Sequence, residues 1–289
     1  MKPSWGDRCF YAFNYIFLIL IALSCLLPFV HIAAVSLSEK AAVDSGHVWL
    51  WPVGFQTNAY RFFFTDTQAL TAFSNSLVIT LGGVALSMLG TIAGAYPLSR
   101  SFLAGRRPLV MGMVFTMLFS GGMIPTYMVV KGLSLIDTYW ALWLPGLVST
   151  YNLLLMKSYF EQLPHELEEA AHLDGCGDIA YLLRVALPLS GPMLATIALF
   201  YGVQYWNSFM NVLMYINKSE LQNLTVVVQA MQQKSELMLT AMEDRQQQEL
   251  MGEMVKAAGV IVLTLPMLAA YPLLQRYFVK GIMLGSIKG

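Results

Sequence analysis

Charged residues are scarce in this chain of 289 residues. Lys plus Arg number 17 and Asp plus Glu number 17, so charged residues make up 12% of the sequence, against about 25% in typical soluble proteins. Apolar and aromatic residues make up 57%, which is more than one water-soluble core buries. A soluble enzyme is therefore nearly excluded. The zero net charge also argues against a nucleic-acid partner, because phosphate binding needs a surplus of basic residues.

Residue patterns for catalysis, metal binding and nucleotide binding are lacking as well. The sequence has three cysteines that form no C-x-x-C pair, Cys9, Cys25 and Cys176, so neither a disulfide framework nor a thiolate metal site is predicted. His165-Glu166 is followed by His172, about 10.5 Å further along a helix, which is too far for two ligands of one zinc ion. Gly-Lys does not occur, so no phosphate-binding P-loop is present. We expect no catalytic residue, no metal ligand and no cofactor on this chain.

Six apolar stretches are long enough, or nearly so, to cross a hydrocarbon core, which takes about 20 residues of helix. None of them contains Asp, Glu, Lys or Arg, and they cover residues 11–35, 73–98, 109–130, 140–156, 192–216 and 257–275. The predicted fold is therefore all-α, a polytopic membrane protein with six transmembrane helices. The first stretch is too long for a secretory signal and is interpreted as a retained helix. Prolines and glycine pairs predict bends in several spans, unless such residues are simply commoner in membrane helices; they are Pro28, Pro97, Pro125, Pro145 and Pro266, with Gly82-Gly83 and Gly121-Gly122.

The orientation is predicted from the loops that retain Lys and Arg, which are cytoplasmic. With six spans both termini lie on one side, and ten of the 17 basic residues share that side. We therefore expect residues 1–10 and the tail 280–289 in the cytoplasm, on either side of a transmembrane domain over residues 11–279. Residues 157–190 would form a cytoplasmic loop and residues 217–256 an extracytoplasmic loop.

The lack of Asp, Glu, Lys and Arg in the spans also helps to distinguish transport mechanisms. Gradient-driven carriers usually place ionisable residues within the membrane as ion or proton relays, and these spans have none. A channel or carrier stays open as an alternative that transport by the purified chain alone would reveal. A membrane enzyme is a further alternative, but no catalytic constellation supports it.

The loop over residues 157–190 is the most informative segment. Pro164 and the glutamates after it predict a short helix over residues 164–173, because acidic side chains favour a helix N-terminus, and Gly175 supplies the conformation that ends it. Asp178 is predicted to cap a second helix over residues 179–187, which Pro188 would stop. The pattern alone fits two interpretations, a helix that docks on a partner and an amphipathic connector on the headgroups. Acidic residues suit anionic lipid poorly.

A family resemblance favours docking. Glu169-Ala170-Ala171, then Gly175 after three residues and Val185-Ala186-Leu187-Pro188 after nine more, resemble the E-A-A loop of permease subunits in binding-protein-dependent ABC importers. Four further segments are similar to carbohydrate-type permeases, in particular those for oligosaccharides and polysaccharide fragments: Pro52-Val53-Gly54-Phe55 with Tyr60, Gly122 to Tyr127, Trp206-Asn207, and Gln275 to Gly281 with Lys288-Gly289. Because the E-A-A loop is shared, an ABC permease for peptides or polyamines stays a second possibility.

The resemblance implies a type I ABC importer permease in the bacterial cytoplasmic membrane. Such a subunit pairs with a second, homologous permease, two cytoplasmic ABC ATPase subunits that bind ATP and Mg, and an extracytoplasmic solute-binding protein. It also implies that the cytoplasmic loop carries the coupling helix. The residues expected to couple to the ATPase are Glu169, Ala170, Ala171, Asp174, Gly175, Leu187 and Pro188.

A polar stripe in the fifth span is the candidate for the substrate pathway. Gln204, Asn207 and Asn211 recur at i, i+3 and i+7, and polar side chains in a membrane helix face protein or water. Amides and aromatic rings also suit sugar hydroxyls and their apolar faces, which adds three candidates: Tyr205, Tyr215 and Asn75. The alternative is that these groups, and Asn152, form hydrogen bonds that hold the two permeases together.

Overall fold

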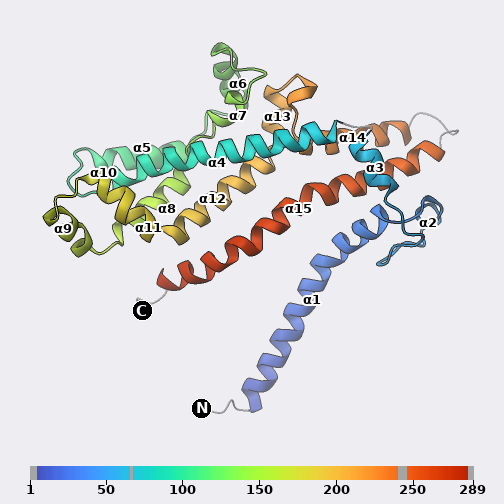
Figure 1. Cartoon of the computed structure of the whole chain (residues 1–289), viewed down its shortest axis with the longest axis horizontal. Coiled ribbons are helices and arrows are strands. Elements are labelled where there is room, and N and C mark those ends of the chain that lie inside the picture. The colour runs from blue at the N-terminus through green and yellow to red at the C-terminus, as the bar shows by residue number, and fades with distance from the viewer. Residues whose placement is uncertain (1–4, 66–67, 240–245, 286–289) are drawn as a thin grey trace. The chain divides into compact units, whose positions relative to one another are not determined.

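The computed structural model describes residues 5–65, 68–239 and 246–285, and every regular element in these ranges is a helix (Figure 1). The chain divides into two compact units. One comprises the described residues of 1–70 and 227–266, and the other those of 71–226 and 267–289.

The first unit begins with a long apolar helix. Helix α1 (Trp5–Ser36) is buried only at Ala34, Val35 and Ser36, and its apolar side chains up to residue 31 are exposed on all sides. A helix that is apolar all round must be surrounded by lipid or by protein, so α1 has the character of a membrane span. The unit continues with α2 (Lys40–Asp44), α3 (Asn58–Thr65), most of α14 (Leu224–Leu239) and the first part of α15 (Gln246–Gly285).

The segment after α1 folds back against the end of that helix. Ser38 Oγ donates to the Ala34 carbonyl at 2.6 Å and accepts the Val53 N–H at 3.1 Å. Gly54 has a φ of +66°, and a Cβ there would lie 2.7 Å from Glu39 Cβ. Gly54 of the segment over residues 52–55, which is similar to carbohydrate-type permeases, therefore has a structural role, because only glycine fits this close turn.

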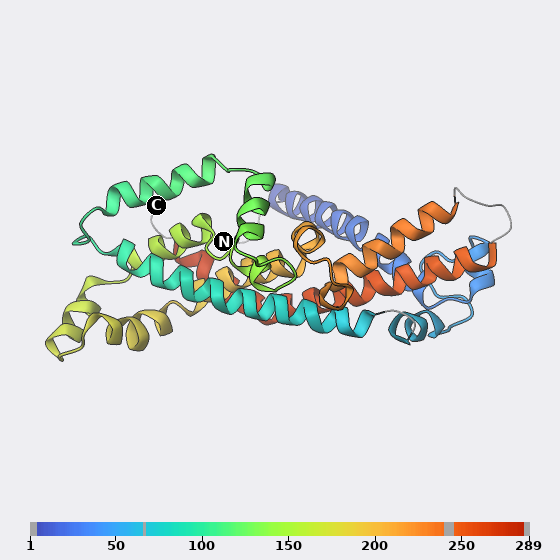
Figure 2. The ribbon, with the colours of Figure 1, turned by 90° about the horizontal axis from the view of Figure 1, so that it is seen from above.

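The second unit contains the remaining helices. They are α4 (Ala69–Ser99, whose first two residues belong to the first unit), α5 (Arg106–Leu118), α6 (Met123–Gly132), α7 (Trp140–Trp143), α8 (Thr150–Glu161), α9 (His165–Leu173), α10 (Asp178–Tyr181), the π-helix η1 (Leu182–Ala186), α11 (Leu187–Leu189), α12 (Gly191–Trp206), α13 (Phe209–Tyr215) and the 3-10 helix η2 (Ser219–Leu221). Figure 2 shows α4 as its longest helix, with α9 projecting beyond one end of it.

Small residues on α4 allow α12 to pack closely against it. The ring of Tyr205 lies directly over Gly83, where a Cβ would meet it at 2.7 Å. Two hydroxyl pairs continue the contact, Ser87 with Tyr205 at 2.9 Å and Thr91 with Tyr201 at 2.7 Å. Positions 83, 87 and 91 share one face of a helix, so this face combines close approach with satisfied polar groups, as membrane helices require.

Another set of α4 glycines accommodates α7 and α8. A Cβ at Gly82 would lie 2.7 Å from the Trp143 ring, and one at Gly94 would lie 2.9 Å from Leu153. Trp143 also donates its indole N–H to the Ile79 carbonyl at 3.0 Å. Helix α4 is thus enclosed on two sides, and its polar contacts hold the rest of the unit in register.

Several predicted spans are not single helices. Among the described residues, three helices are long and apolar enough to cross a membrane, or up to five if each of two bent pairs is one span. The predicted third span is bent by 111° between α5 and α6, because Gly122 has a φ of +88° outside the helical region. The predicted fourth span is two separate helices, α7 and α8. Much of the expected loop 217–256 is helical, in α14 and α15.

Two surface segments of the second unit meet at Asp137. Its carboxylate accepts the backbone N–H groups of Asn217 at 2.5 Å and Lys218 at 3.2 Å, while its own N–H donates to the Tyr215 carbonyl at 2.9 Å. The hydrogen bond from the Asn217 N–H is the main reason that the pKa of this carboxyl is lowered. Asp137 therefore ties the α6–α7 connection to the chain after α13.

We predict that Gly83→Ala destabilises the protein. The added methyl group would overlap the Tyr205 ring, which Ser87 holds in place, and overpacking costs about 1–3 kcal/mol, partly offset by the better helix propensity of alanine, about 1 kcal/mol. The melting temperature of detergent-solubilised protein measures the change. Gly112→Ala is the matched control, since a Cβ there meets nothing within 4 Å; equal melting temperatures for the two variants would contradict the predicted contact.

Acid should weaken the junction at Asp137. Because its pKa in the folded protein is below the unfolded value, its stabilising effect is complete above the unfolded pKa of about 4 and is lost as the pH falls through the folded value. Asp137→Asn should lower the melting temperature at neutral pH and reduce its fall between about pH 5 and pH 3. Glu166→Gln, at an exposed carboxylate, is the control. An unchanged pH dependence in Asp137→Asn would show that this carboxylate does not contribute.

Candidate functional site

Helix α9 is the centre of the loop that the sequence singles out. It runs from His165 to Leu173, so the predicted short helix is confirmed, with Pro164 one position before its first residue. Gly175 has a φ of +79°, and the Cys176 N–H bonds back to the Ala171 carbonyl at 2.9 Å. The glycine thus ends the helix in the left-handed conformation that its missing Cβ permits.

The second predicted helix differs from the structure at both ends. Gly177 is the capping position and Asp178 the first helical residue, so the prediction that Asp178 caps the helix is wrong. The predicted stop at Pro188 is wrong too, since the helix passes through η1 and α11 to Leu189. The wider π-helical turn before Pro188 makes room for its ring, which would otherwise clash with the carbonyl four residues earlier. At Ser190 the chain bends by 83° into α12.

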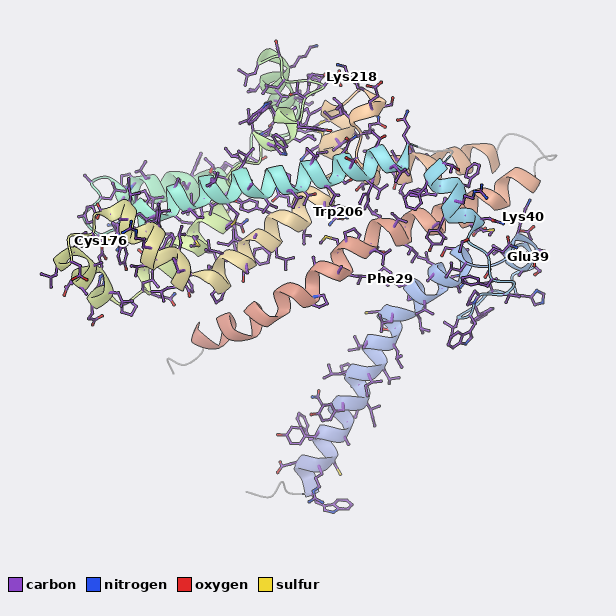
Figure 3. The ribbon with its side chains drawn as sticks, in the orientation of Figure 1. Phe29, Glu39, Lys40, Cys176, Trp206 and Lys218 are labelled. Carbon is purple, nitrogen blue, oxygen red and sulfur yellow. The ribbon has the colours of Figure 1, made fainter. Side chains whose placement is uncertain are left out.

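Most of the predicted coupling residues face outward. Glu169, Ala170, Asp174, Gly175 and Pro188 are exposed. Ala171 and Leu187 are partly buried and pack against the hydrophobic core of the unit. The loop therefore offers an acidic and small-residue surface on one side, while its other side rests on the body of the protein. Figure 3 shows Cys176 in the turn that follows α9, far from Lys218, which follows α13.

Sequence reasoning missed the apolar side chains of the same surface. Leu173 is 89% exposed and Ile179 is 75% exposed, on either side of the Gly175 turn. These two side chains add apolar area to the acidic outer surface of the loop. The sequence does contain a signal for this surface, because Leu173 and Ile179 are large apolar residues in an otherwise acidic loop.

The polar stripe predicted in the fifth span does not exist as one helical face. Helix α12 ends at Trp206, and Asn207 is its C-cap, with its side chain donating to the Val203 carbonyl at 3.0 Å. Asn211 belongs to α13, after the break. The prediction of a continuous i, i+3, i+7 stripe is therefore wrong, since helical spacing holds only while the helix continues. Gln204, Asn207 and Asn211 are all exposed.

The other pathway candidates are buried in packing within the chain. Tyr205 is 4% exposed and bonds to Ser87, and Tyr215 is 3% exposed with its ring stacked on Tyr127. Asn75 donates to two carbonyls of the 220–222 segment, at 2.7 and 2.9 Å, and accepts the Tyr139 hydroxyl at 2.9 Å. These polar groups have the partners that a buried site demands, so their first role is structural.

Within the described part of the chain, no group of three or more His, Cys, Asp or Glu side chains is arranged to hold a metal ion. His172 instead lies 3.6 Å from the Asp178 carboxylate, within the turn between α9 and α10.

A family model decides the identity. The model for the binding-protein-dependent transport system inner membrane component matches residues 1–284. The chain belongs to this family. This permease is therefore a membrane-embedded transport subunit of an ABC importer and not itself an enzyme.

Similar proteins cover almost the whole permease. Protein LplC of Bacillus subtilis is 42% identical over 289 residues, covering 100% of this chain and 98% of that protein. The polygalacturonan/rhamnogalacturonan transport system permease protein YtcP of Bacillus subtilis is 41% identical, with 98% of this chain and 99% of that protein covered.

A crystal structure of a bacterial ABC transporter involved in the import of the acidic polysaccharide alginate contains a similar chain. The TM-score is 0.86 at 32% identity, and the match covers 96% of this chain and 99% of the other. The all-α, type I importer permease fold that the resemblance implies is thereby confirmed. The count of six spans is not, because the bent pairs leave it open among the described residues.

Proposed function

We propose that this permease forms half of the translocation pathway for an oligosaccharide or a polysaccharide fragment. The support comes from its relatives. One relative is a polygalacturonan/rhamnogalacturonan transport system permease protein, and the similar solved chain belongs to an ABC transporter involved in the import of the acidic polysaccharide alginate. Both resemble this chain over nearly its full length. Similarity confined to the coupling loop would support only a shared contact with an ATPase, whereas similarity over all the helices also supports a shared translocation pathway.

The second half of the pathway would be a homologous permease. The exposed apolar surface of α1 needs lipid or protein around it, and a paired permease supplies part of that cover. Two cytoplasmic ABC ATPase subunits would bind ATP and Mg, and an extracytoplasmic solute-binding protein would deliver the sugar. Both termini would be cytoplasmic.

The observation that carries the coupling role is the outward surface of the α9 loop. Glu169, Ala170 and Asp174 are exposed beside the exposed Leu173 and Ile179. A groove on an ATPase subunit would take the small and apolar side chains, while its basic residues would pair with the acids. Alternating access would follow as a rigid-body motion of this loop when the ATPases close on ATP.

The coupling role predicts that Glu169→Lys and Gly175→Val abolish substrate-stimulated ATP hydrolysis without preventing membrane insertion. The first reverses an exposed charge, and the second forces a β-branched residue into φ +79°, which is strained for any residue with a Cβ. The test uses the importer purified through a tag on this chain, with the second permease, the ATPases and the binding protein expected to co-purify. Normal transport by both variants would refute the assignment.

The exposed amides give a separate prediction about the pathway. Asn207→Ala and Asn211→Ala should raise the KM for uptake into proteoliposomes, because each removes a sugar-binding amide, while assembly is unchanged. The probes are fragments of polygalacturonan, rhamnogalacturonan and alginate, with maltodextrin for comparison. Gln222→Ala, at a partly buried amide outside the stripe, is the control. Loss of assembly with unchanged affinity would favour hydrogen bonding between the two permeases instead.

A further inference from the structure

Helix α9 has few inward-facing side chains, and one of them is charged. No residue of α9 is fully buried, and only Glu168 and Ala171 of this helix are partly buried. Ala171 offers a single methyl group. The orientation of the helix on the body of the protein therefore depends largely on what Glu168 contacts.

Glu168 forms an ion pair with Arg100, the residue that follows α4. The Arg100 Nη1 donates to Glu168 Oε2, and their side chains are only 11% and 18% exposed. Solvent screens a pair at this depth far less than a surface pair. The contact joins the end of the longest helix of the unit directly to the proposed coupling helix.

Two aromatic rings fix the Arg100 guanidinium in place. Its Cζ lies 4.4 Å from the centre of the Tyr96 ring, one turn earlier on α4, and 5.4 Å from that of Tyr181 on α10. Tyr96 also donates its hydroxyl to the Asp178 carbonyl at 3.2 Å. A planar guanidinium suits such stacking, which lysine does not reproduce. Arg100 therefore contacts α4, α9 and α10 together.

The same site is not arranged for maximum stability. Arg100 Nε and Nη2 are buried and have no hydrogen-bond partner, and unpaired buried donors destabilise a fold. Apolar side chains of similar volume often stabilise a protein as well as a buried ion pair does, whereas the pair specifies one geometry. The arrangement fits a device that orients α9.

We propose that Arg100 is the positioning residue that transmits the motion of α9 to α4. This inference rests on the proposed coupling function, since α9 must first receive that motion from an ATPase. Through its pair with Glu168 and its contacts with Tyr96 and Tyr181, Arg100 makes α9, α10 and the end of α4 move as one body. Without it, α9 would follow the ATPase while α4 lagged behind.

The direct test is a distance measurement in the complete importer. Spin labels at Glu166→Cys on α9 and Leu89→Cys on α4, both exposed positions, are introduced after replacing the native cysteines by serine. We expect one narrow distance distribution with and without ATP plus vanadate in the otherwise unchanged protein. Arg100→Gln should give a broad distribution that shifts when ATP and vanadate are added. A distribution that stays narrow in Arg100→Gln would overturn the inference.

ATP hydrolysis separates positioning from a purely structural role. Arg100→Gln and Glu168→Gln should each reduce the stimulation by binding protein loaded with polygalacturonan fragments about tenfold, within the usual range of coupling free energies, and leave the basal rate unchanged. The double variant should be no worse than either single variant, because both remove one interaction. Additive losses, or a parallel fall in the basal rate, would contradict the proposal.

Two variants complete the comparison. Arg107→Gln removes an exposed arginine close in sequence and should retain stimulation, so an equal loss there would point to general charge and not to the pair. Glu169→Lys distinguishes a failure of the coupling function from a failure of the role of Arg100. If it transports normally, the coupling function itself fails; if it is uncoupled while Arg100→Gln is not, only the role of Arg100 fails.

Discussion

The close packing of α12 against α4 is the contact on which the rest of the second unit depends. In a segment without water, a polar group must find its partner within the protein, and close approach requires small residues. The face formed by Gly83, Ser87 and Thr91 meets both demands, since the tyrosine rings of α12 rest on it and their hydroxyls bond to it. The glycines on another side of α4 accommodate Trp143 and Leu153. These contacts join α4 to α7, α8 and α12, and Arg100 at its end pairs with Glu168 of the loop.

That loop has two sides with different chemistry. Its outer side carries acidic, small and exposed apolar residues. Its inner side packs on the hydrophobic core of the unit and is joined to the end of α4 by the partly buried pair of Glu168 and Arg100, whose guanidinium lies near two aromatic rings. Under the proposed coupling role, force applied by an ATPase to the outer side would reach α4 through this charged contact of defined direction. A purely apolar contact would allow the helix to slide, because hydrophobic contacts are non-directional.

The sequence predicted the helices of the coupling loop better than it predicted the arrangement of the pathway residues, because helix ends depend on neighbouring residues. The end of α9 is determined by Pro164, the first-turn glutamates and Gly175, all within a few residues of one another, and capping depends on such neighbours. The pathway stripe assumed that the helix continues through Asn207. Nothing in residues 204–211 breaks a helix as strongly as proline does, and the break is decided by contacts with distant segments, such as those of Tyr205 with α4 and of Tyr215 with Tyr127. Asn75 likewise has its partners in segments far away in the sequence.

Composition and motif by themselves determined that this is an all-α membrane permease of an ABC importer, because scarce charge excludes a soluble core and the E-A-A loop has a specific spacing. Only the tertiary structure decided which of the candidate polar residues are exposed and which are buried. It buried Tyr205, Tyr215 and Asn75 in hydrogen bonds and packing, left Gln204, Asn207 and Asn211 exposed, and brought Arg100 to Glu168 across 68 positions of sequence. The physical reason is that burial and pairing are properties of three-dimensional neighbours, which a linear pattern specifies only within a turn or two of helix.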